Sequence, residues 1–116
     1  MSEMVAPVEM DAAVKVFKLL GDKTRLTIVT CLMEDECCVC EFVELFGMSQ
    51  PAVSQHVRKL RDAGLVEEER RGQWVFYRIN QTHPLYPLVE SVVRHLPEQK
   101  SRLLDLAERG LRVCCK

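Results

Sequence analysis

Apolar residues recur in steps of three and four over most of the chain, a spacing that places side chains on one face of an α-helix. This pattern predicts helices over residues 9–20 and 39–46, and a helix between them that Asp22 would cap. Ser49 is typical of an N-cap and predicts a longer helix that ends near residue 63. The first half of the chain is therefore predicted to be largely helical.

Between residues 65 and 80 the apolar period changes to two, which is typical of strands. We expect strands over residues 66–70 and 74–79, joined by a turn around Arg71-Gly72-Gln73. These strands would form a β-hairpin with a basic tip, because Arg70 and Arg71 lie at the turn.

Helical spacing returns at Leu85 and continues to Leu96, and a last helix is expected over residues 98–111. A chain of 116 residues forms one modest core, so long apolar helices at both ends have little core left to cover. We therefore expect residues 10–20 and 85–111 to pair across a homodimer interface. The alternative is that these helices simply pack on the single core.

The predicted order of elements is short helix, tight turn, longer helix and hairpin, which is typical of a winged helix-turn-helix. The predicted fold is mainly α with a small β-hairpin, in a single domain over residues 1–116. The helix-turn-helix would span residues 39–63 and the wing residues 65–80. An α-helix fits the major groove of DNA, and a basic hairpin can lie along the phosphates.

Polar side chains on the second helix of this unit are candidates for reading base edges, because amide, hydroxyl and guanidinium groups pair with them. The candidate DNA contacts are Ser49, Gln50, Ser54, Gln55, His56 and Arg58 on this helix, with Arg70 and Arg71 on the wing. A merely solvated polar face is the alternative, and the three glutamates at residues 67–69 would repel phosphate.

The net charge of −1 says little about nucleic acid by itself, although the first third of the chain is acidic and the rest slightly basic. No apolar run approaches the roughly 18 residues that span a membrane. The acidic N-terminus, interrupted by Pro7, lacks the features of a secretory signal. We therefore expect a cytoplasmic protein with no membrane partner.

Six cysteines is a high count for a chain of this length. Without a secretory signal, reduced thiols and metal ligation are better expectations than a disulfide framework. Cys37, Cys38 and Cys40 lie close together, and Cys114 and Cys115 come at the end of the sequence. Thiolates are soft donors that select thiophilic ions over magnesium or calcium, so these five cysteines are the candidate ligands.

The spacing of the first cluster has a mechanical consequence. Residues two apart on a regular helix do not face each other, so Cys38 and Cys40 can hold one ion only if the first turn is non-helical or distorts. Cys37 and Cys40 are three apart and could meet without distortion. We expect the N-terminus of the helix predicted over residues 39–46 to lower the thiol pKa. A bound ion would pull on the start of this helix, which we expect to pack against the longer helix that follows Ser49.

Two segments resemble the ArsR/SmtB family of metal-sensing repressors. Residues 20–26, Leu-Gly-Asp-Lys-Thr-Arg-Leu, resemble the family's opening signature, and residues 49–66 closely resemble its recognition helix and the entry to its wing. The resemblance extends from about Met10 to Leu96. It implies a helical dimer with a wing that binds double-stranded operator DNA without inducer and releases it when inducer binds.

Residues 36–41, Glu-Cys-Cys-Val-Cys-Glu, resemble the Cys-Val-Cys box of members that respond to arsenic, antimony, cadmium or lead. This resemblance implies Cys38 and Cys40 as ligands, with Cys37 in place of the usual apolar residue. Cadmium and lead sensors typically add N-terminal cysteines, and residues 1–30 contain none. We therefore favour As(III) or Sb(III) as inducer over Cd(II) or Pb(II), with Cys37, Cys114 or Cys115 giving a third thiolate.

Three other functions fit parts of the sequence. The clustered thiols would also suit a redox or reactive-sulfur sensor of the same fold. A thiol enzyme is disfavoured, because the Cys37-x-x-Cys40 pair does not follow a strand in an alternating βα pattern. A structural zinc module is disfavoured because the cysteines lack paired C-x₂-C spacing. We therefore expect a regulator, not an enzyme.

Overall fold

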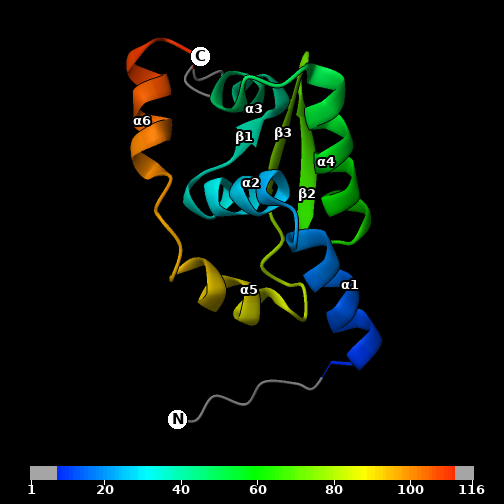
Figure 1. Ribbon diagram of the computed structural model, residues 1–116. Coiled ribbons are helices and arrows are strands. Elements are labelled where there is room, and N and C mark those ends of the chain that lie inside the picture. Colours follow the sequence, from blue (N-terminus) through cyan, green and yellow to red (C-terminus); the bar gives the residue numbers. More distant parts are fainter. Residues whose placement is uncertain (1–7, 112–116) are drawn as a thin grey trace.

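The computed structural model describes residues 8–111, which form six helices and three short strands (Figure 1). The elements are α1 (Met10–Leu20), α2 (Lys23–Glu34), β1 (Cys37–Cys38), α3 (Val39–Phe46), α4 (Gln50–Asp62), β2 (Val66–Arg71), β3 (Trp74–Ile79), α5 (Tyr86–Val93) and α6 (Lys100–Glu108). The expected winged helix-turn-helix is confirmed, with α3 and α4 as the helix-turn-helix and β2 and β3 as the wing.

Helix α2 lies at the centre of the molecule and packs on α4 and β3 (Figure 1). Ile28 and Val29 of α2 are fully buried, as are Phe42 of α3 and Val53 of α4. These side chains belong to one core, so the orientation of α4 is set by the same apolar contacts that hold the domain together.

Local signals place the boundaries of the helix-turn-helix. Gly47 ends α3 with φ at 64°, a left-handed conformation that glycine adopts without steric cost. Ser49 begins α4, and its hydroxyl accepts a hydrogen bond from the backbone N–H of Ala52 at 3.3 Å. Both signals are visible in the sequence, which is why α3 was predicted with its observed bounds.

The sheet has one strand more than predicted. Its order is β1-β3-β2, and both pairings are antiparallel. In β1, Cys37 lies opposite Tyr77 and Cys38 opposite Phe76. A strand of two residues is too short to show alternation, so the expected two-stranded hairpin was incomplete. The missing strand joins the cysteine cluster to the wing.

The wing turn is tighter than expected. Arg71 pairs with Trp74 as the last rung of the ladder, which leaves Gly72 and Gln73 as a two-residue turn. Gly72 has φ at 63°, as the first central position of a type II′ turn requires. Arg71 therefore belongs to β2 and not to the turn.

The two C-terminal helices are shorter than the predicted ones, which spanned residues 85–96 and 98–111. Helix α5 ends at Val93, before Pro97, and α6 begins at Lys100. The Glu98 carboxylate accepts a hydrogen bond from the backbone N–H of Ser101 at 3.1 Å, which fixes the start of α6. Gly110, with φ at 74°, follows its end.

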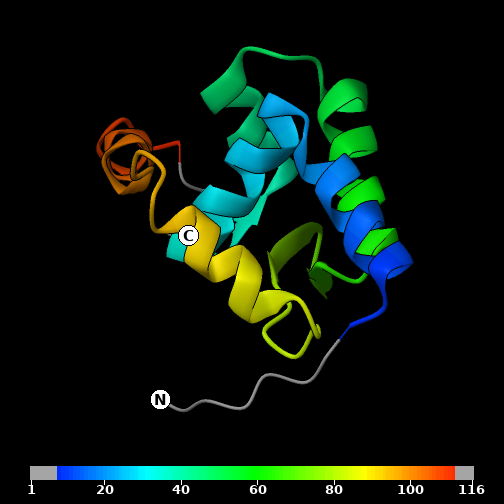
Figure 2. The ribbon, with the colours of Figure 1, turned by 60° about the horizontal axis from the view of Figure 1, so that its bottom comes forward.

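Helices α1 and α5 lie at one end of the molecule, whereas α6 packs beside α2 and α3 (Figures 1 and 2). Cys114 and Cys115 lie outside the described residues. Within residues 8–111, no helix is long and apolar enough to cross a membrane.

The docking of α6 can be tested with two neighbouring leucines. Leu103 is 3% exposed and Leu104 is 54% exposed. We expect Leu103→Ala to lower the free energy of unfolding in urea by about 2–5 kcal/mol, because it leaves a cavity between α6 and the core. Leu104→Ala is the matched control and should change it by less than about 0.5 kcal/mol. Equal effects would show that α6 is not docked in solution.

Candidate functional site

The thiols of Cys38 and Cys40 meet at the start of α3, with their sulfur atoms 2.7 Å apart. Cys38 is the N-cap residue, with φ −105° and ψ 167°, and therefore lies outside the helical repeat. Its extended backbone turns the side chain towards Cys40 in the first turn. The requirement for a non-helical first position is met, and the helix itself needs no distortion to bring both sulfurs to one ion.

A reciprocal capping box ties this thiol pair to the helix. The Cys38 sulfur accepts a hydrogen bond from the backbone N–H of Glu41, and the Glu41 carboxylate accepts one from the backbone N–H of Cys38 at 2.9 Å. Glu41 is fully buried. A ligand that moves the Cys38 sulfur would therefore disturb the hydrogen bonds that begin α3.

The environment of Cys38 favours the neutral thiol. Burial, the hydrogen bond with Cys40 and the nearby Glu41 charge raise its pKa to about 12. The backbone N–H of Glu41 opposes this shift but is outweighed. The expectation that the helix N-terminus lowers the thiol pKa is therefore wrong for Cys38, because desolvation acts more strongly than the helix end.

Cys37 faces a different environment. It is fully buried in the apolar core, and its sulfur lies 3.7 Å from the backbone oxygen of Asp35. Successive strand residues point to opposite faces, so Cys37 and Cys38 diverge. The argument that Cys37 and Cys40 share a helical face does not apply, because Cys37 belongs to β1. Cys31 is buried in α2, as expected for a small core residue.

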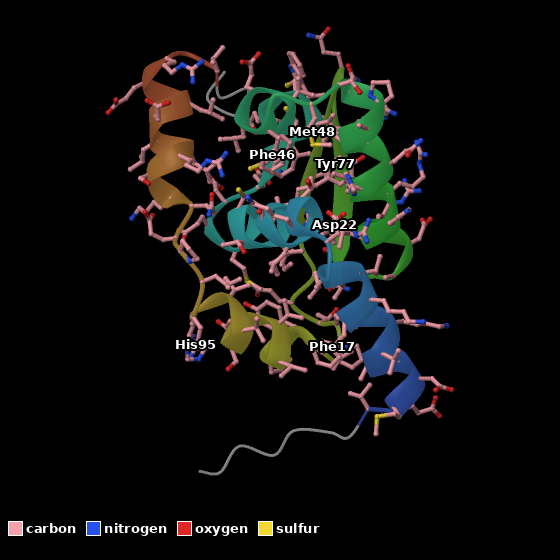
Figure 3. The ribbon with its side chains drawn as sticks, viewed as in Figure 1. Phe17, Asp22, Phe46, Met48, Tyr77 and His95 are labelled. Atoms are coloured by element: carbon pink, nitrogen blue, oxygen red, sulfur yellow. The ribbon has the colours of Figure 1, made fainter. Side chains whose placement is uncertain are left out.

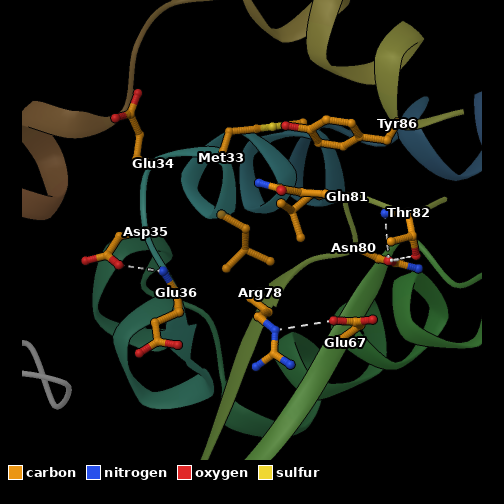
Figure 4. A pocket seen from close by; sticks show the side chains of 12 residues that line it. Met33, Glu34, Asp35, Glu36, Glu67, Arg78, Asn80, Gln81, Thr82 and Tyr86 are labelled. Atoms are coloured by element: carbon orange, nitrogen blue, oxygen red, sulfur yellow. Dashed lines mark hydrogen bonds and ion pairs between the residues drawn. The ribbon is translucent and has the colours of Figure 1, made fainter.

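A cavity of about 510 Å³ opens between the end of α2, the sheet and the start of α5 (Figure 4). Carboxylates from Glu34, Asp35, Glu36 and Glu67 line it, and Arg78 pairs with Glu67 at 3.3 Å. Over residues 8–111, no three His, Cys, Asp or Glu side chains form a group that could hold a metal ion. The thiol pair therefore remains the candidate ligand site.

The recognition helix presents part of the predicted contact set to solvent. Val53, Val57 and Leu60 are buried against the core, which leaves the opposite face of α4 open. Gln50, Gln55 and Arg58 are exposed there and Ser54 is half-buried. These groups suit base-edge contacts, whereas the Ser49 hydroxyl is already engaged as the N-cap of α4.

His56 is turned towards the protein. Its Nδ1 lies 3.2 Å from Nη1 of Arg25, which in turn donates from Nε to the backbone oxygen of Leu19 at 2.7 Å. His56 is half-buried in this contact and ties α4 to α2. The same side chain is therefore less open to DNA than its sequence position suggested.

The two wing arginines differ. Arg70 is exposed, and no ion pair or hydrogen bond from its side chain is found within the described part of the chain. Arg71 is held by Glu36 at 2.6 Å and by Glu69 at 2.8 Å. The wing glutamates that were expected to repel phosphate are themselves paired: Glu67 with Arg78, Glu68 with Arg61, and Glu69 with Arg71 and Arg78.

His83, which lies just before α5, has a structural role. Its Nδ1 accepts a hydrogen bond from the backbone N–H of Leu85 at 3.0 Å, so Nε2 carries the proton and donates to the backbone oxygen of Ala63 at 3.2 Å. This side chain joins the end of the recognition helix to the start of α5. A lone histidine between a strand and a helix gives no sequence signal for such a bridge.

Comparison with known proteins decides the family. A model of the bacterial regulatory protein arsR family matches residues 22–68. The arsenic resistance transcriptional regulator ArsR1 of Pseudomonas putida is 37% identical over 101 residues, which cover 81% of this chain and 79% of that protein. The chain belongs to the ArsR family.

Other relatives of this ArsR-family protein are regulators with different named metals. The arsenical resistance operon repressor of Escherichia coli K12 is 35% identical, over 83% of this chain and 72% of its own length. A cadmium resistance transcriptional regulatory protein, the CadC homolog of Staphylococcus aureus, is 37% identical over 79% and 75%.

Solved structures agree with the fold. Reduced HlyU from Vibrio cholerae superposes with a TM-score of 0.67 at 32% identity, covering 76% of this chain and 92% of that one. The transcriptional repressor BigR from Xylella fastidiosa gives 0.63 at 30%, covering 77% and 90%. The relatives ArsR1, the arsenical resistance operon repressor and BigR are named as transcriptional regulators or repressors. This ArsR-family protein is therefore a DNA-binding transcriptional repressor, and the expectation that it is a regulator and not an enzyme is confirmed.

The raised pKa of Cys38 predicts slow alkylation. A thiol with a pKa near 12 is about 0.01% thiolate at pH 8, and only the thiolate reacts. We expect iodoacetamide to modify Cys38 at least about 10-fold more slowly than free cysteine at pH 8, with a rate that rises steadily to pH 10. Peptide mass spectrometry measures the modification of Cys38 and of Cys40 separately, and the exposed Cys40 is the internal comparison. Equal rates at Cys38 and free cysteine would contradict the raised pKa.

Proposed function

We propose that this protein binds operator DNA as a homodimer and releases it when As(III) or Sb(III) binds the thiols of Cys38 and Cys40. The observation that carries the proposal is the 2.7 Å separation of these sulfurs at the start of the first helix of the DNA-binding unit. The names of the arsenic-resistance relatives support the choice of ion.

The raised pKa of Cys38 favours a metalloid over a metal cation. Two thiols and one molecule of arsenous acid, As(OH)₃, exchange to give two As–S bonds and two waters, because each thiol proton leaves with a hydroxyl group. No proton is released to solvent, so the raised pKa of Cys38 does not oppose the exchange. Cd(II) or Pb(II) must instead expel both thiol protons, which costs affinity near neutral pH.

A third thiolate would complete a pyramidal site. The proposal assigns it to Cys114 or Cys115 first, because Cys37 faces the core. Helix α6, which precedes these two residues in the sequence, is joined to α3 by a hydrogen bond from Nη2 of Arg102 to the backbone oxygen of Leu45 at 2.9 Å. Cys37 would join only if β1 opened.

On DNA, we place the exposed face of α4 in the major groove. Gln50, Ser54, Gln55 and Arg58 would read base edges, and Arg70 would contact phosphate. Ser49 and His56 hold α4 in position and lie at the edges of this surface. The internal pairing of the wing glutamates limits their repulsion of phosphate.

The homodimer would form through α1 and α5. Met10, Phe17 and Leu88 are exposed apolar side chains on these helices, and an apolar cavity of about 160 Å³ lies between α1, α2 and α5. Phe17 is directed towards the space between α1 and α5 (Figure 3). A second copy with the same surface would bury this patch, and its two-fold axis would set two α4 helices about 34 Å apart.

The test is fluorescence anisotropy of the reduced protein on DNA from upstream of its own gene, titrated with arsenite, antimonite, cadmium and lead. We expect arsenite or antimonite to weaken DNA binding by roughly 5- to 150-fold, the usual range of allosteric coupling. The concentration that gives half release should stay the same at pH 7 and pH 8 for arsenite. For cadmium it should fall as pH rises, because protons must leave.

The controls assign the ligands. Cys38→Ser/Cys40→Ser should bind DNA as the wild type does and stay bound when arsenite is added. Cys114→Ser/Cys115→Ser should need more arsenite if either residue gives the third thiolate. The proposal would be overturned if arsenite released DNA from Cys38→Ser/Cys40→Ser, or if no ion released DNA from the wild type.

A redox sensor of the same fold is the second candidate, because sulfurs 2.7 Å apart can also be joined by a two-electron oxidant as a disulfide. The same anisotropy titration with hydrogen peroxide distinguishes the two. Release by peroxide and not by arsenite would favour this candidate.

The dimer surface has its own test. We expect Phe17→Glu to produce a monomer in sedimentation velocity, because a charge would be buried in the proposed interface. Gln73→Glu adds the same charge at the wing tip and should leave the dimer intact. A dimeric Phe17→Glu variant, or a monomeric wild type, would contradict the proposed surface.

A further inference from the structure

Arg71 was expected to contact phosphate, but its guanidinium is clamped to the body of the protein. Its Nη1 donates to Oε2 of Glu36 at 2.6 Å, and its Nη2 donates to Oε1 of the same carboxylate at 2.8 Å. This bidentate fork fixes orientation as well as distance. The guanidinium also lies over the Phe76 ring, 4.7 Å from its centroid.

Two of the partners of Arg71, Glu36 and Phe76, adjoin the thiol pair. Glu36 lies two residues before Cys38, and Phe76 is the residue that pairs with Cys38 across the β1–β3 ladder. The wing arginine therefore touches the neighbours of Cys38 along the chain and across the sheet. The contact with Glu36 joins residues 35 positions apart in sequence.

The segment that carries Glu36 has little freedom of its own. The Asp35 carboxylate accepts a hydrogen bond from the backbone N–H of Glu36 at 2.8 Å (Figure 4). On the wing side, Glu69 accepts from both Arg71 and Arg78 at 2.8 Å. An isolated exposed ion pair contributes little, but a bidentate pair within such a network holds a defined geometry. These contacts offer a route by which a shift of Cys38 would reach Arg71.

We propose that Glu36 and Arg71 are positioning residues that transmit ligand binding at Cys38 and Cys40 to the wing. Without ligand, the clamp holds the wing against the body in the orientation that binds DNA. A ligand on the thiols displaces β1, the fork to Glu36 breaks, and the wing leaves its DNA-binding position. This inference deepens the proposed function and rests on it for the identity of the ligand.

DNA affinity without ligand separates this role from direct phosphate contact. If Arg71 contacted phosphate and Glu36 merely competed for it, Glu36→Gln would free the arginine, remove a negative charge and tighten DNA binding. If the two residues form the clamp, Glu36→Gln loosens the wing, and we expect DNA binding to weaken by about 3- to 10-fold, within the usual range of coupling effects. Tighter binding would overturn the proposal.

The salt dependence gives a second criterion. Loss of a phosphate contact lowers the salt slope of binding by about one, whereas loss of a positioning contact leaves it unchanged. We expect Arg71→Gln and the double variant Glu36→Gln/Arg71→Gln to match Glu36→Gln in affinity and salt slope. Arg70→Gln is the matched control, and it should lower the slope.

The relay itself can be read without DNA, because the single tryptophan of the chain, Trp74, pairs with Arg71 on the wing. Arsenite should change Trp74 fluorescence in the wild type. Glu36→Gln should bind arsenite with the same protection of the exposed Cys40 from alkylation but lose the fluorescence change. Release of DNA with no Trp74 response, or a response that survives Glu36→Gln, would overturn the relay and leave the proposed sensor intact.

The relay can also be tested if the proposed sensor fails. If arsenite protects no thiol, the proposed sensor fails, and the relay is then tested with iodoacetamide, which adds bulk at the thiol pair. Modified wild type should show the Trp74 change and weaker DNA binding, and modified Glu36→Gln should not. Identical responses in both proteins would overturn the relay.

Discussion

The extended backbone at Cys38 is the constraint on which the proposed sensor depends. Cys38 pairs with β3, caps α3 and faces Cys40. It can do so because its φ and ψ are those of a strand, while its side chain caps the helix that follows. Had Cys38 been inside the helix, its sulfur would point away from Cys40. The strand-to-helix junction thus builds the thiol pair and connects it to the wing and to the helix-turn-helix.

Burial and charge act together at this junction. A capping thiol that is buried and close to the buried Glu41 stays protonated, so the site suits a ligand that takes up the proton as it binds. The adjacent Cys37 belongs to the core that α2, α3 and α4 share. A change at the thiols therefore acts on elements that share contacts, which is what a two-state regulator needs.

The wing shows how pairing changes the meaning of a residue type. In the sequence, the three consecutive glutamates suggest repulsion of the DNA phosphates. The two arginines that follow them suggest attraction to the phosphates. In the fold, the glutamates neutralise Arg61, Arg71 and Arg78, and Arg70 is the wing arginine left facing solvent. The electrostatic surface that DNA meets is set by which charges find partners.

The sequence by itself determined the helix-turn-helix, the hairpin and the family, because N-caps, the glycine at residue 47 and apolar periods act over a few residues. It also marked Cys38 and Cys40 as a pair with a required non-helical turn. Only the tertiary structure decided that β1 exists, that Cys37 faces the core, that His56 meets Arg25 and that Arg71 meets Glu36. Those contacts join positions that are distant in sequence, and their geometry follows from packing, which no local pattern encodes.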